Sequence, residues 1–337
     1  MTERPVTAAV LGAGSWGSVL AIHLHRLGHQ VRLWSFEEAV VEEVRSLGEN
    51  RSYLPDVPFP SGLGVSSKMS EVLHGAELVV SVSPSQFVGR VMSEATGHME
   101  PDALVVSASK GIEIDTLRRM DEVIAPLLPP TSRDALSVLS GPSFAMEVAR
   151  GTPTAVVAAS TSRPSRLRVQ RIFSSDRFRV YTNDDVVGVE LGGSVKNVIA
   201  LAAGVAAGLG YGHNTRAALI TRGLAEITRL GEAMGAASST FAGLAGMGDL
   251  VLTCTGELSR NRTVGKRLGE GESLEKILSE MKAVAEGVRT APAVQALAER
   301  HGVEMPITAQ VVAILEGRQA PEQAVHELMI RDPKAEN

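Results

Sequence analysis

The chain has 337 residues, of which 44% are hydrophobic and 21% charged, so wholesale disorder is excluded and about two globular domains are expected. Its 33 basic and 38 acidic side chains give a net charge of −5, which argues against a nucleic-acid partner because no basic excess is present. The single cysteine, Cys254, excludes an internal disulfide and fits a reducing compartment such as the cytoplasm.

The first half of the chain alternates β-branched runs with helical patterns, and it shows no secretory signal pattern. The predicted strands are Val6–Leu11, Val31–Trp34, Leu78–Ser81, Ala103–Ser107, Leu136–Leu139 and Thr154–Ala158. The predicted helices between them include Gly17–Leu27, Phe36–Leu47 and Thr116–Leu127, and Gly48–Gly64 is interpreted as a surface loop. Alternation of this kind is typical of βαβ units, so we predict an α/β domain with a parallel sheet over residues 1–182.

The second half, residues 183–337, is predicted to be all-helical because strand-like runs are scarce. Apolar positions recur at helical spacing over Val186–Leu209, Thr215–Met234, Leu274–Met281, Thr290–Arg300, Thr308–Glu316 and Ala320–Leu328. The stretch Asn197–Thr215 has no Asp, Glu, Lys or Arg, and we interpret it as a buried helix rather than a membrane span. Such an Ala/Gly-rich helix packs either within one subunit or between the subunits of a homodimer, and the sequence leaves both open.

Gly12, Gly14 and Gly17 follow the first predicted strand and open the first predicted helix. At this spacing the first glycine permits a tight turn, the second lets a pyrophosphate approach the backbone, and the third allows close helix–strand packing. The helix N-terminus adds free N–H groups and a positive dipole end. An ordinary glycine turn is the alternative, but this context favours a Rossmann-like domain that binds a dinucleotide.

The residues after the second predicted strand bear on the choice between NAD and NADP. An acid at this position typically binds the ribose of NAD, whereas an arginine accommodates the 2′-phosphate of NADP. Glu37 is a candidate ribose acceptor, while Ser35 and Glu38 have the spacing of a helix capping box. Because no basic residue follows the strand before Arg45, the segment favours NAD or dual use, and the preference stays open.

Two lysines are candidates for chemistry. Lys110 follows the predicted strand Ala103–Ser107, at the edge where open α/β sheets bind ligands. Lys196 adjoins the uncharged helix, where burial would favour a neutral amine that can act as a general base. A solvated surface lysine is the alternative for each.

Polar residues in the second half complete a candidate site. Asp249 is the one acid in Gly243–Leu252, where a helix cap or turn is the alternative role. Ser259-Arg260-Asn261-Arg262 leads into the predicted helix Val264–Leu268, and a charged fork beside an amide donor suits a phosphate. An exposed polar loop is the alternative there. Cys254 has no His or Asp partner and is expected to pack in the core, and no metal-binding spacing is present.

Taken together, the motifs resemble the soluble bacterial NAD(P)-dependent sn-glycerol-3-phosphate dehydrogenases. They are, in order, Gly-Ala-Gly-Ser-Trp-Gly at 12–17, Ser-Lys-Gly at 109–111, Gly-Pro-Ser-Phe-Ala at 141–145, Lys-Asn at 196–197, Gly-Asp at 248–249, Ser-Arg-Asn-Arg at 259–262 and Val-Ala-Glu-Gly at 284–287. The resemblance implies reversible hydride transfer between sn-glycerol 3-phosphate and NAD(P)+, giving dihydroxyacetone phosphate. It also implies a cytoplasmic enzyme without a membrane span that supplies glycerol phosphate for phospholipid synthesis.

The resemblance further implies residue roles. Lys196 would be the proton acceptor, with Lys110 and Asp249 as catalytic partners. The implied substrate-binding residues are Lys110, Gly141, Ser143, Lys196, Asp249, Ser259, Arg260 and Asn261. The implied cofactor-binding residues are Gly12, Gly14, Ser15, Trp16, Gly17, Phe36, Tyr53, Lys110, Ala145, Arg260, Val284 and Glu286. Many bacterial members carry a basic residue where this chain has Ser35-Phe36-Glu37, so the segment looks more like NAD-preferring relatives.

Two other functions fit parts of the pattern. A 6-phosphogluconate or β-hydroxyacid-type dehydrogenase also pairs a nucleotide domain with a helical domain and a Lys-Asn step. A non-catalytic dinucleotide sensor would keep the glycine turn without turnover. Ser259–Arg262 and the 141–145 segment favour the glycerol phosphate reaction over the first, and the retained lysines argue against the second.

Overall fold

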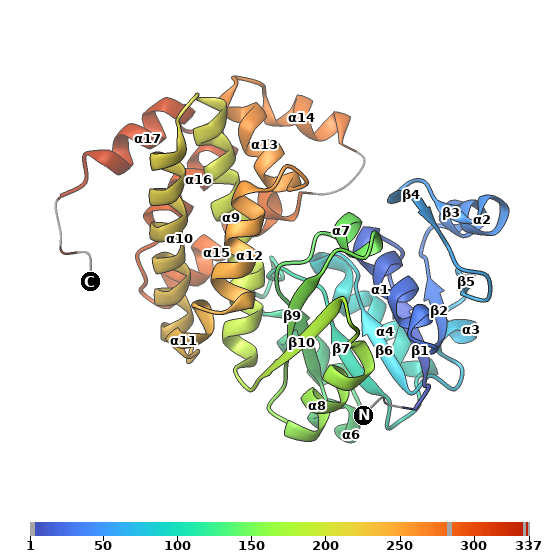
Figure 1. Ribbon diagram of the computed structural model, residues 1–337. Coiled ribbons are helices and arrows are strands. Elements are labelled where there is room, and N and C mark those ends of the chain that lie inside the picture. The colour runs from blue at the N-terminus through green and yellow to red at the C-terminus, as the bar shows by residue number, and fades with distance from the viewer. Residues whose placement is uncertain (1–3, 282–284, 333–334, 336–337) are drawn as a thin grey trace.

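The computed structural model describes residues 4–281, 285–332 and 335, and it places a sheet domain beside a helical domain (Figure 1). The main sheet has eight strands in the order β10-β9-β8-β7-β6-β1-β2-β5. Their bounds are β1 Thr7–Leu11, β2 Gln30–Trp34, β5 Gly64–Ser66, β6 Leu78–Ser81, β7 Leu104–Ser107, β8 Ser137–Ser140, β9 Thr154–Ala159 and β10 Phe178–Asn183. A separate antiparallel pair is formed by β3 (Glu49–Asn50) and β4 (Leu54–Pro58).

Helices cover both faces of the sheet. They are α1 Ser15–Arg26, α2 Glu38–Leu47, α3 Met69–Leu73, α4 Val88–Ala95, α5 Met120–Ile124, α6 Pro130–Asp134, α7 Ala145–Ala149 and α8 Arg163–Phe173. Alternate residues of β1 enter opposite cores: Val10 packs with Leu20 of α1, and Leu11 with Met92 of α4. Because both faces are buried, the strands are near-continuous apolar runs, as in parallel α/β sheets.

The helical domain is built around α9 (Val186–Gly208). The other helices are α10 His213–Ala233, α11 Ser238–Phe241, α12 Asp249–Thr255, α13 Arg260–Gly269, α14 Leu274–Glu280, α15 Glu286–Arg300, α16 Pro306–Leu315 and α17 Pro321–Met329, with a π-helical turn at Leu244–Gly248. Glycines let α9 and α13 touch, since a Cβ added at Gly204 would lie 2.2 Å from the Arg262 carbonyl oxygen. Among the described residues α9 is the one helix whose length and composition would suit a membrane span, yet 83% of its most apolar stretch is buried. It is therefore a core helix within its own subunit.

The predicted fold class, a Rossmann-like domain followed by an all-α domain, is confirmed. The predicted parallel sheet is present, with one departure: β9 pairs antiparallel with β8, so β9 and β10 run opposite to the other strands. The last strand, β10, was not expected, and the predicted loop Gly48–Gly64 contains the β3–β4 pair. The predicted boundary between residues 182 and 183 falls at the end of β10 and stays a prediction.

The predicted helix Thr116–Leu127 begins only at Met120. Leu117 has a φ of +58°, which no α-helix accommodates, and Ile112 and Arg119 form an antiparallel bridge. Residues 112–119 are consequently a closed loop, and only Gly111 separates this loop from Lys110.

Candidate active site

The glycine turn has the geometry of a phosphate-binding cradle. Gly12 has a φ of +131°, and a Cβ there would lie 2.9 Å from the Val82 carbonyl oxygen. A Cβ at Gly17 would lie 1.8 Å from the Gly12 carbonyl oxygen, whereas one at Gly14 would meet nothing within 4 Å. Of these three glycines, only Gly14 therefore faces open space. Since Gly14 is the N-cap of α1 and provides no side-chain cap, the first-turn N–H groups suit the pyrophosphate of a dinucleotide.

The other residues expected near the cofactor surround this turn. The Ser15 hydroxyl donates a hydrogen bond to the Tyr53 carbonyl oxygen at 2.5 Å, which ties α1 to the segment between β3 and β4. The Trp16 ring lies 6.5 Å from that of Phe178 and packs on the sheet core. Ala145 begins α7, which packs beside α1. Val284 lies outside the described residues.

The segment after β2 gathers Glu37, Tyr53 and an unexpected arginine. The predicted capping box is wrong: the Ser35 hydroxyl accepts the Glu37 N–H at 3.2 Å, and α2 begins at Glu38 without a side-chain cap. The Glu37 carboxylate instead accepts the Tyr53 hydroxyl at 3.0 Å. Phe36 is 72% exposed, and the guanidinium carbon of Arg90, on α4, lies over its ring at 5.9 Å from the ring centre. A positive charge from α4 therefore lies near this segment, although residues 35–44 contain no lysine or arginine.

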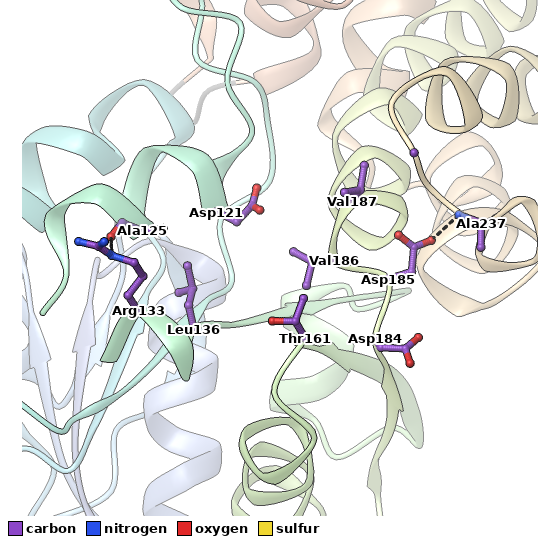
Figure 2. A pocket seen from close by; sticks show the side chains of 11 residues that line it. Asp121, Ala125, Arg133, Leu136, Thr161, Asp184, Asp185, Val186, Val187 and Ala237 are labelled. Atoms are coloured by element: carbon purple, nitrogen blue, oxygen red, sulfur yellow. Dashed lines mark hydrogen bonds between the residues drawn. The ribbon is translucent and has the colours of Figure 1, made fainter. Parts of the chain in front are cut away.

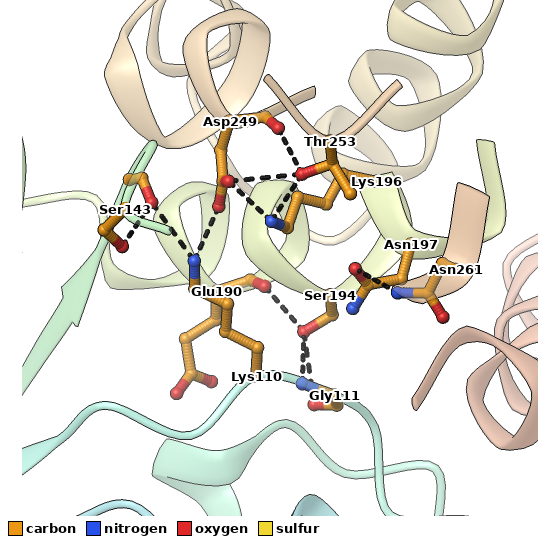
Figure 3. A network of polar contacts seen from close by, with 11 residues as sticks. Lys110, Gly111, Ser143, Glu190, Ser194, Lys196, Asn197, Asp249, Thr253 and Asn261 are labelled. Carbon is orange, nitrogen blue, oxygen red and sulfur yellow. Dashed lines mark hydrogen bonds and ion pairs between the residues drawn. The ribbon is translucent and has the colours of Figure 1, made fainter. Parts of the chain in front are cut away.

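Lys110, Lys196 and Asp249 meet between the domains, as Figure 3 shows. One Asp249 carboxylate oxygen lies 2.5 Å from Lys196 Nζ and the other 2.7 Å from Lys110 Nζ. The Asp249 side chain is 1% exposed, the Lys196 side chain 8% and the Lys110 side chain 18%. One carboxylate thus pairs with two ammonium groups in a site that is largely shielded from solvent. The desolvation of these charges costs free energy, and such arrangements are typical of functional sites.

A π-helical turn places Asp249 at this point. Its glycines permit contacts that a side chain would block, since a Cβ at Gly246 would lie 2.2 Å from the Phe241 carbonyl oxygen. On the facing helix, a Cβ at Gly192 would lie 2.4 Å from the Ala245 carbonyl oxygen. Because α9 is in direct contact with the π-helical turn, Asp249 at the start of α12 faces Lys196 on α9. Single π-helical turns of this kind occur frequently at functional sites.

Burial lowers the pKa of Lys196 to about 8. The Asp249 carboxylate opposes this decrease, and the like charge of Lys110 adds to it. Burial is the largest of these causes, as the sequence analysis expected for Lys196. Burial also raises the pKa of the neighbouring Cys254 thiol to about 12, so it stays neutral and packs in the helical core.

Gly141 and Ser143 lie beside Lys110 at the end of β8. Lys110 Nζ donates to the Gly141 carbonyl oxygen at 3.1 Å, and the Ser143 hydroxyl donates to the same oxygen at 3.0 Å. Gly141 has a φ of +133°, and a Cβ there would lie 3.0 Å from Val156 Cα, so the turn requires glycine. The segment fixes the direction of the Lys110 side chain.

The start of α13 contacts α9 beside Lys196, through Asn261 and Asn197. The predicted helix Val264–Leu268 in fact begins at Arg260, because the Ser259 hydroxyl caps it by accepting the Arg262 N–H at 3.2 Å. The Asn261 amide donates to Asn197 Oδ1 at 3.0 Å and accepts the Gly287 N–H at 2.9 Å. Ser259 and Asn261 are thus held by the protein, whereas Arg260 is exposed.

Glu286, at the start of α15, lies within electrostatic reach of the site. Burial raises the pKa of its carboxyl, and the positive charges of Arg260, Lys110 and Lys196 oppose that increase. The structure therefore gathers these four predicted residues at one place, although 176 positions of sequence separate Lys110 from Glu286.

Thr253 is a site residue that the sequence analysis missed. Its hydroxyl lies 2.8 Å from Lys196 Nζ and donates to the Asp249 main-chain carbonyl oxygen at 2.6 Å. It follows Asp249 by four residues, so the helical spacing of two polar residues on one buried face was the available signal.

A cavity of about 440 Å³ lies elsewhere between the domains (Figure 2). Its wall includes Asp184, Asp185 and Thr161, and none of the lysine cluster borders it. Asp185 caps α9 and accepts the Ala237 N–H at 3.0 Å, and Asp184 pairs with Arg166 at 3.7 Å. Because these carboxylates serve the fold, the lysine cluster is the better candidate site.

A phosphate-cradling turn joined to a buried lysine with a lowered pKa defines the class of NAD(P)-dependent dehydrogenases. Residues 7–165 match the family described as NAD-dependent glycerol-3-phosphate dehydrogenase N-terminus, and residues 185–326 match the corresponding C-terminus. The chain belongs to the NAD-dependent glycerol-3-phosphate dehydrogenase family.

Individual relatives agree. The chain is 56% identical over 327 residues to "Glycerol-3-phosphate dehydrogenase [NAD(P)+]" of Geobacter metallireducens, covering 97% of this chain and 98% of that protein. The crystal structure of glycerol-3-phosphate dehydrogenase from Coxiella burnetii is similar with a TM-score of 0.92 and 42% identity, covering 97% and 99% of the two chains. The yeast enzyme GPD1 from Saccharomyces cerevisiae is similar with a TM-score of 0.81 and 25% identity, covering 98% and 100%.

Proposed function

We propose that this protein catalyses reversible hydride transfer between C2 of sn-glycerol 3-phosphate and NAD(P)+, giving dihydroxyacetone phosphate and NAD(P)H. The observation that carries the proposal is the buried cluster of Lys196, Asp249 and Lys110 in a chain of this family. The relatives' names favour this reaction over a 6-phosphogluconate or β-hydroxyacid-type dehydrogenase and over a dinucleotide sensor.

In the oxidative direction, neutral Lys196 takes the proton of the C2 hydroxyl, and in the reductive direction its ammonium protonates the C2 oxygen. The glycine turn and the N-terminus of α1 would hold the dinucleotide, which would supply the hydride acceptor or donor when bound. Lys110 contributes positive charge beside that oxygen, and Asp249 holds both amines in place. Arg260 and the N-terminus of α13 bind the phosphate, so that its binding energy orients the reacting carbon.

The test is a comparison of initial rates with dihydroxyacetone phosphate, using NADH and NADPH in parallel. Turnover should be far faster than with 6-phosphogluconate or a β-hydroxyacid and the oxidised cofactors. Absence of turnover with dihydroxyacetone phosphate, while either cofactor still binds, would favour the sensor.

Arg260→Ala is expected to raise the KM for dihydroxyacetone phosphate by about 10- to 100-fold, since a charge-assisted bond to a phosphate contributes about 1.5–3 kcal/mol. The KM for unphosphorylated dihydroxyacetone should hardly change. Steady-state kinetics with both substrates check this, and Arg318→Ala, at an exposed surface pair, is the control. Equal effects on the two substrates would contradict the clamp.

The pH dependence follows from the lowered pKa of Lys196. Because oxidation needs the neutral amine, kcat/KM for glycerol 3-phosphate should rise with pH and level off above about 8. Reduction needs the ammonium, so its rate should fall above the same pH. Profiles in both directions check this, and an inflection near the ordinary lysine value would contradict it.

Arg90 bears on the choice of cofactor. Its guanidinium lies 5.9 Å from the centre of the Phe36 ring, and Phe36 adjoins Glu37, the candidate ribose acceptor. A guanidinium at this place suits a 2′-phosphate. Arg90→Gln should therefore lower kcat/KM for NADPH by about tenfold and leave NADH nearly unchanged. Steady-state kinetics with NADPH and NADH measure both values of kcat/KM. Arg45→Gln, at an arginine on α2, is the control. An equal loss with NADH would assign Arg90 to the fold.

We further propose a cytoplasmic enzyme without a membrane span that supplies glycerol phosphate for phospholipid synthesis. The burial of α9 inside the helical domain supports this. A homodimer stays a prediction, and sedimentation equilibrium of the full chain would test it. Since α9 packs within one subunit, a dimer would have to use other surfaces.

A further inference from the structure

Glu190 is a buried carboxylate that the reaction does not use. It lies on α9, is 5% exposed, and points away from Lys196 in Figure 3. Both of its carboxylate oxygens accept the Asp121 main-chain N–H, at 3.1 and 3.2 Å, and Arg119 Nε lies 3.8 Å away. Asp121 belongs to the first turn of α5, where main-chain N–H groups have no partner inside the helix. A side chain of the helical domain therefore accepts a hydrogen bond from the first turn of a helix in the sheet domain.

A second bond lies one turn further along α9. The Ser194 hydroxyl accepts the Gly111 N–H at 2.9 Å and lies 2.8 Å from the Glu190 main-chain carbonyl oxygen, to which it can donate. Positions 190 and 194 share one face of the helix. The loop 111–121 is thus fastened to that face at both ends, and the Ile112–Arg119 bridge closes it between them.

Lys110 immediately precedes the first fastening point. A Cβ at Gly193, on the same helix face, would lie 3.6 Å from the Lys110 Cγ and Cδ atoms and 2.6 Å from Ser140 Oγ, so the lysine chain runs close along α9. Its Nζ then reaches Asp249 at 2.7 Å. The reach of Lys110 depends on how closely residues 110–121 sit on α9.

We propose that Glu190 is a positioning residue that caps the first turn of α5 across the domain junction and so holds the 110–121 segment where Lys110 meets Asp249. This inference rests on the proposed function, because the roles of Lys110 and Lys196 do. Burial raises the pKa of Glu190 well above its ordinary value, and the nearby Asp121 carboxylate adds to the increase while Arg119 opposes it.

Glu226 offers a matched control. It is also a buried helix carboxylate, 2% exposed, and it accepts the Ile307 and Thr308 N–H groups at the start of α16. Burial raises the pKa of its carboxyl as well. It performs the same structural task inside the helical domain, away from Lys110.

The experiment compares Glu190→Met and Glu226→Met in the full-length enzyme. Methionine keeps the length of the side chain but lacks the oxygen that accepts the main-chain N–H. Glu190→Met should lower kcat by about 10- to 100-fold, because small displacements of catalytic groups have effects of this size. It should also move the Lys196 inflection above about 8, since Lys110 would lie farther away and the Asp249 carboxylate would pair with Lys196 alone. Glu226→Met should lower the Tm and leave kcat and the inflection unchanged.

A Glu190→Met enzyme with wild-type kcat and inflection would overturn the proposal, as would equal shifts in both variants. Should Glu190→Met fail to fold, Ser194→Ala removes the acceptor of the Gly111 N–H alone, and it must show the same upward shift. A crystal structure of whichever variant folds supplies a readout without turnover: a Lys110–Asp249 distance still near 2.7 Å would also overturn the proposal. If the proposed function itself is wrong, the wild-type enzyme will show no turnover with dihydroxyacetone phosphate. That result differs from a failure of the Glu190 proposal, in which the wild-type enzyme is active.

Discussion

Replacing Lys196 with methionine is expected to lower kcat by about 10²- to 10⁴-fold in both directions, the usual contribution of a positioned proton donor and acceptor. The physical reason is that Lys196 Nζ is the amine in the cluster whose pKa, lowered by burial to about 8, allows it to carry or release a proton near neutral pH. Substrate and cofactor binding should change much less, since phosphate binding is assigned to Arg260 and pyrophosphate binding to the glycine turn.

Initial rates, together with cofactor binding followed by nicotinamide fluorescence, measure the two effects separately. Methionine keeps the length and apolar stem of lysine, so the buried site stays filled. Lys276→Met, at a side chain that is 60% exposed, is the control and should retain wild-type rates. A Lys196→Met enzyme with a near-normal rate would remove Lys196 from the proton transfer.

The sheet domain was largely predictable because its signals are local. The strand β1 and the glycines at 12, 14 and 17 follow from apolar runs and spacing alone, and the structure confirms the turn that they predict. The direction of β9 was not predictable, because an antiparallel pairing with β8 depends on how the chain crosses over, which no residue pattern of β9 encodes.

The candidate site residues were predicted from motifs, but the surroundings of their side chains were not. Nothing near Lys110 in the sequence indicates that it shares a carboxylate with Lys196, since Asp249 lies 139 positions away. Thr253 and Glu190 were missed because a threonine or a glutamate within a helix is ordinarily a solvated residue. Thr253 gains its partners by burial against α9 inside the helical domain, whereas Glu190 gains its partner from the sheet domain. Arg90 was missed because the search for a cation followed β2 along the chain, whereas the charge comes from α4.

Asp249→Asn is the variant expected to separate the two directions of the reaction. The carboxylate raises the pKa of Lys196, against the effects of burial and of Lys110. With an amide in its place, both ammonium groups lose their counter-charge, so the pKa of Lys196 should fall below about 8. A larger fraction of the amine is then neutral at neutral pH than in the wild-type enzyme. Reduction of dihydroxyacetone phosphate, which needs the ammonium, should therefore lose more rate than oxidation of glycerol 3-phosphate.

The sign of this shift is opposite to that expected for Glu190→Met, which makes the pair of variants informative together. Breaking a buried ion pair on one side typically destabilises a protein by about 3–5 kcal/mol, so the Tm should also fall, although loss of a proton from Lys196 reduces that cost. Asp184→Asn, at a side chain that is 78% exposed, is the control for the loss of one surface charge. Profiles of kcat/KM against pH in both directions decide the matter, and an inflection for Asp249→Asn at or above the wild-type value would show that Asp249 does not set the proton affinity of Lys196.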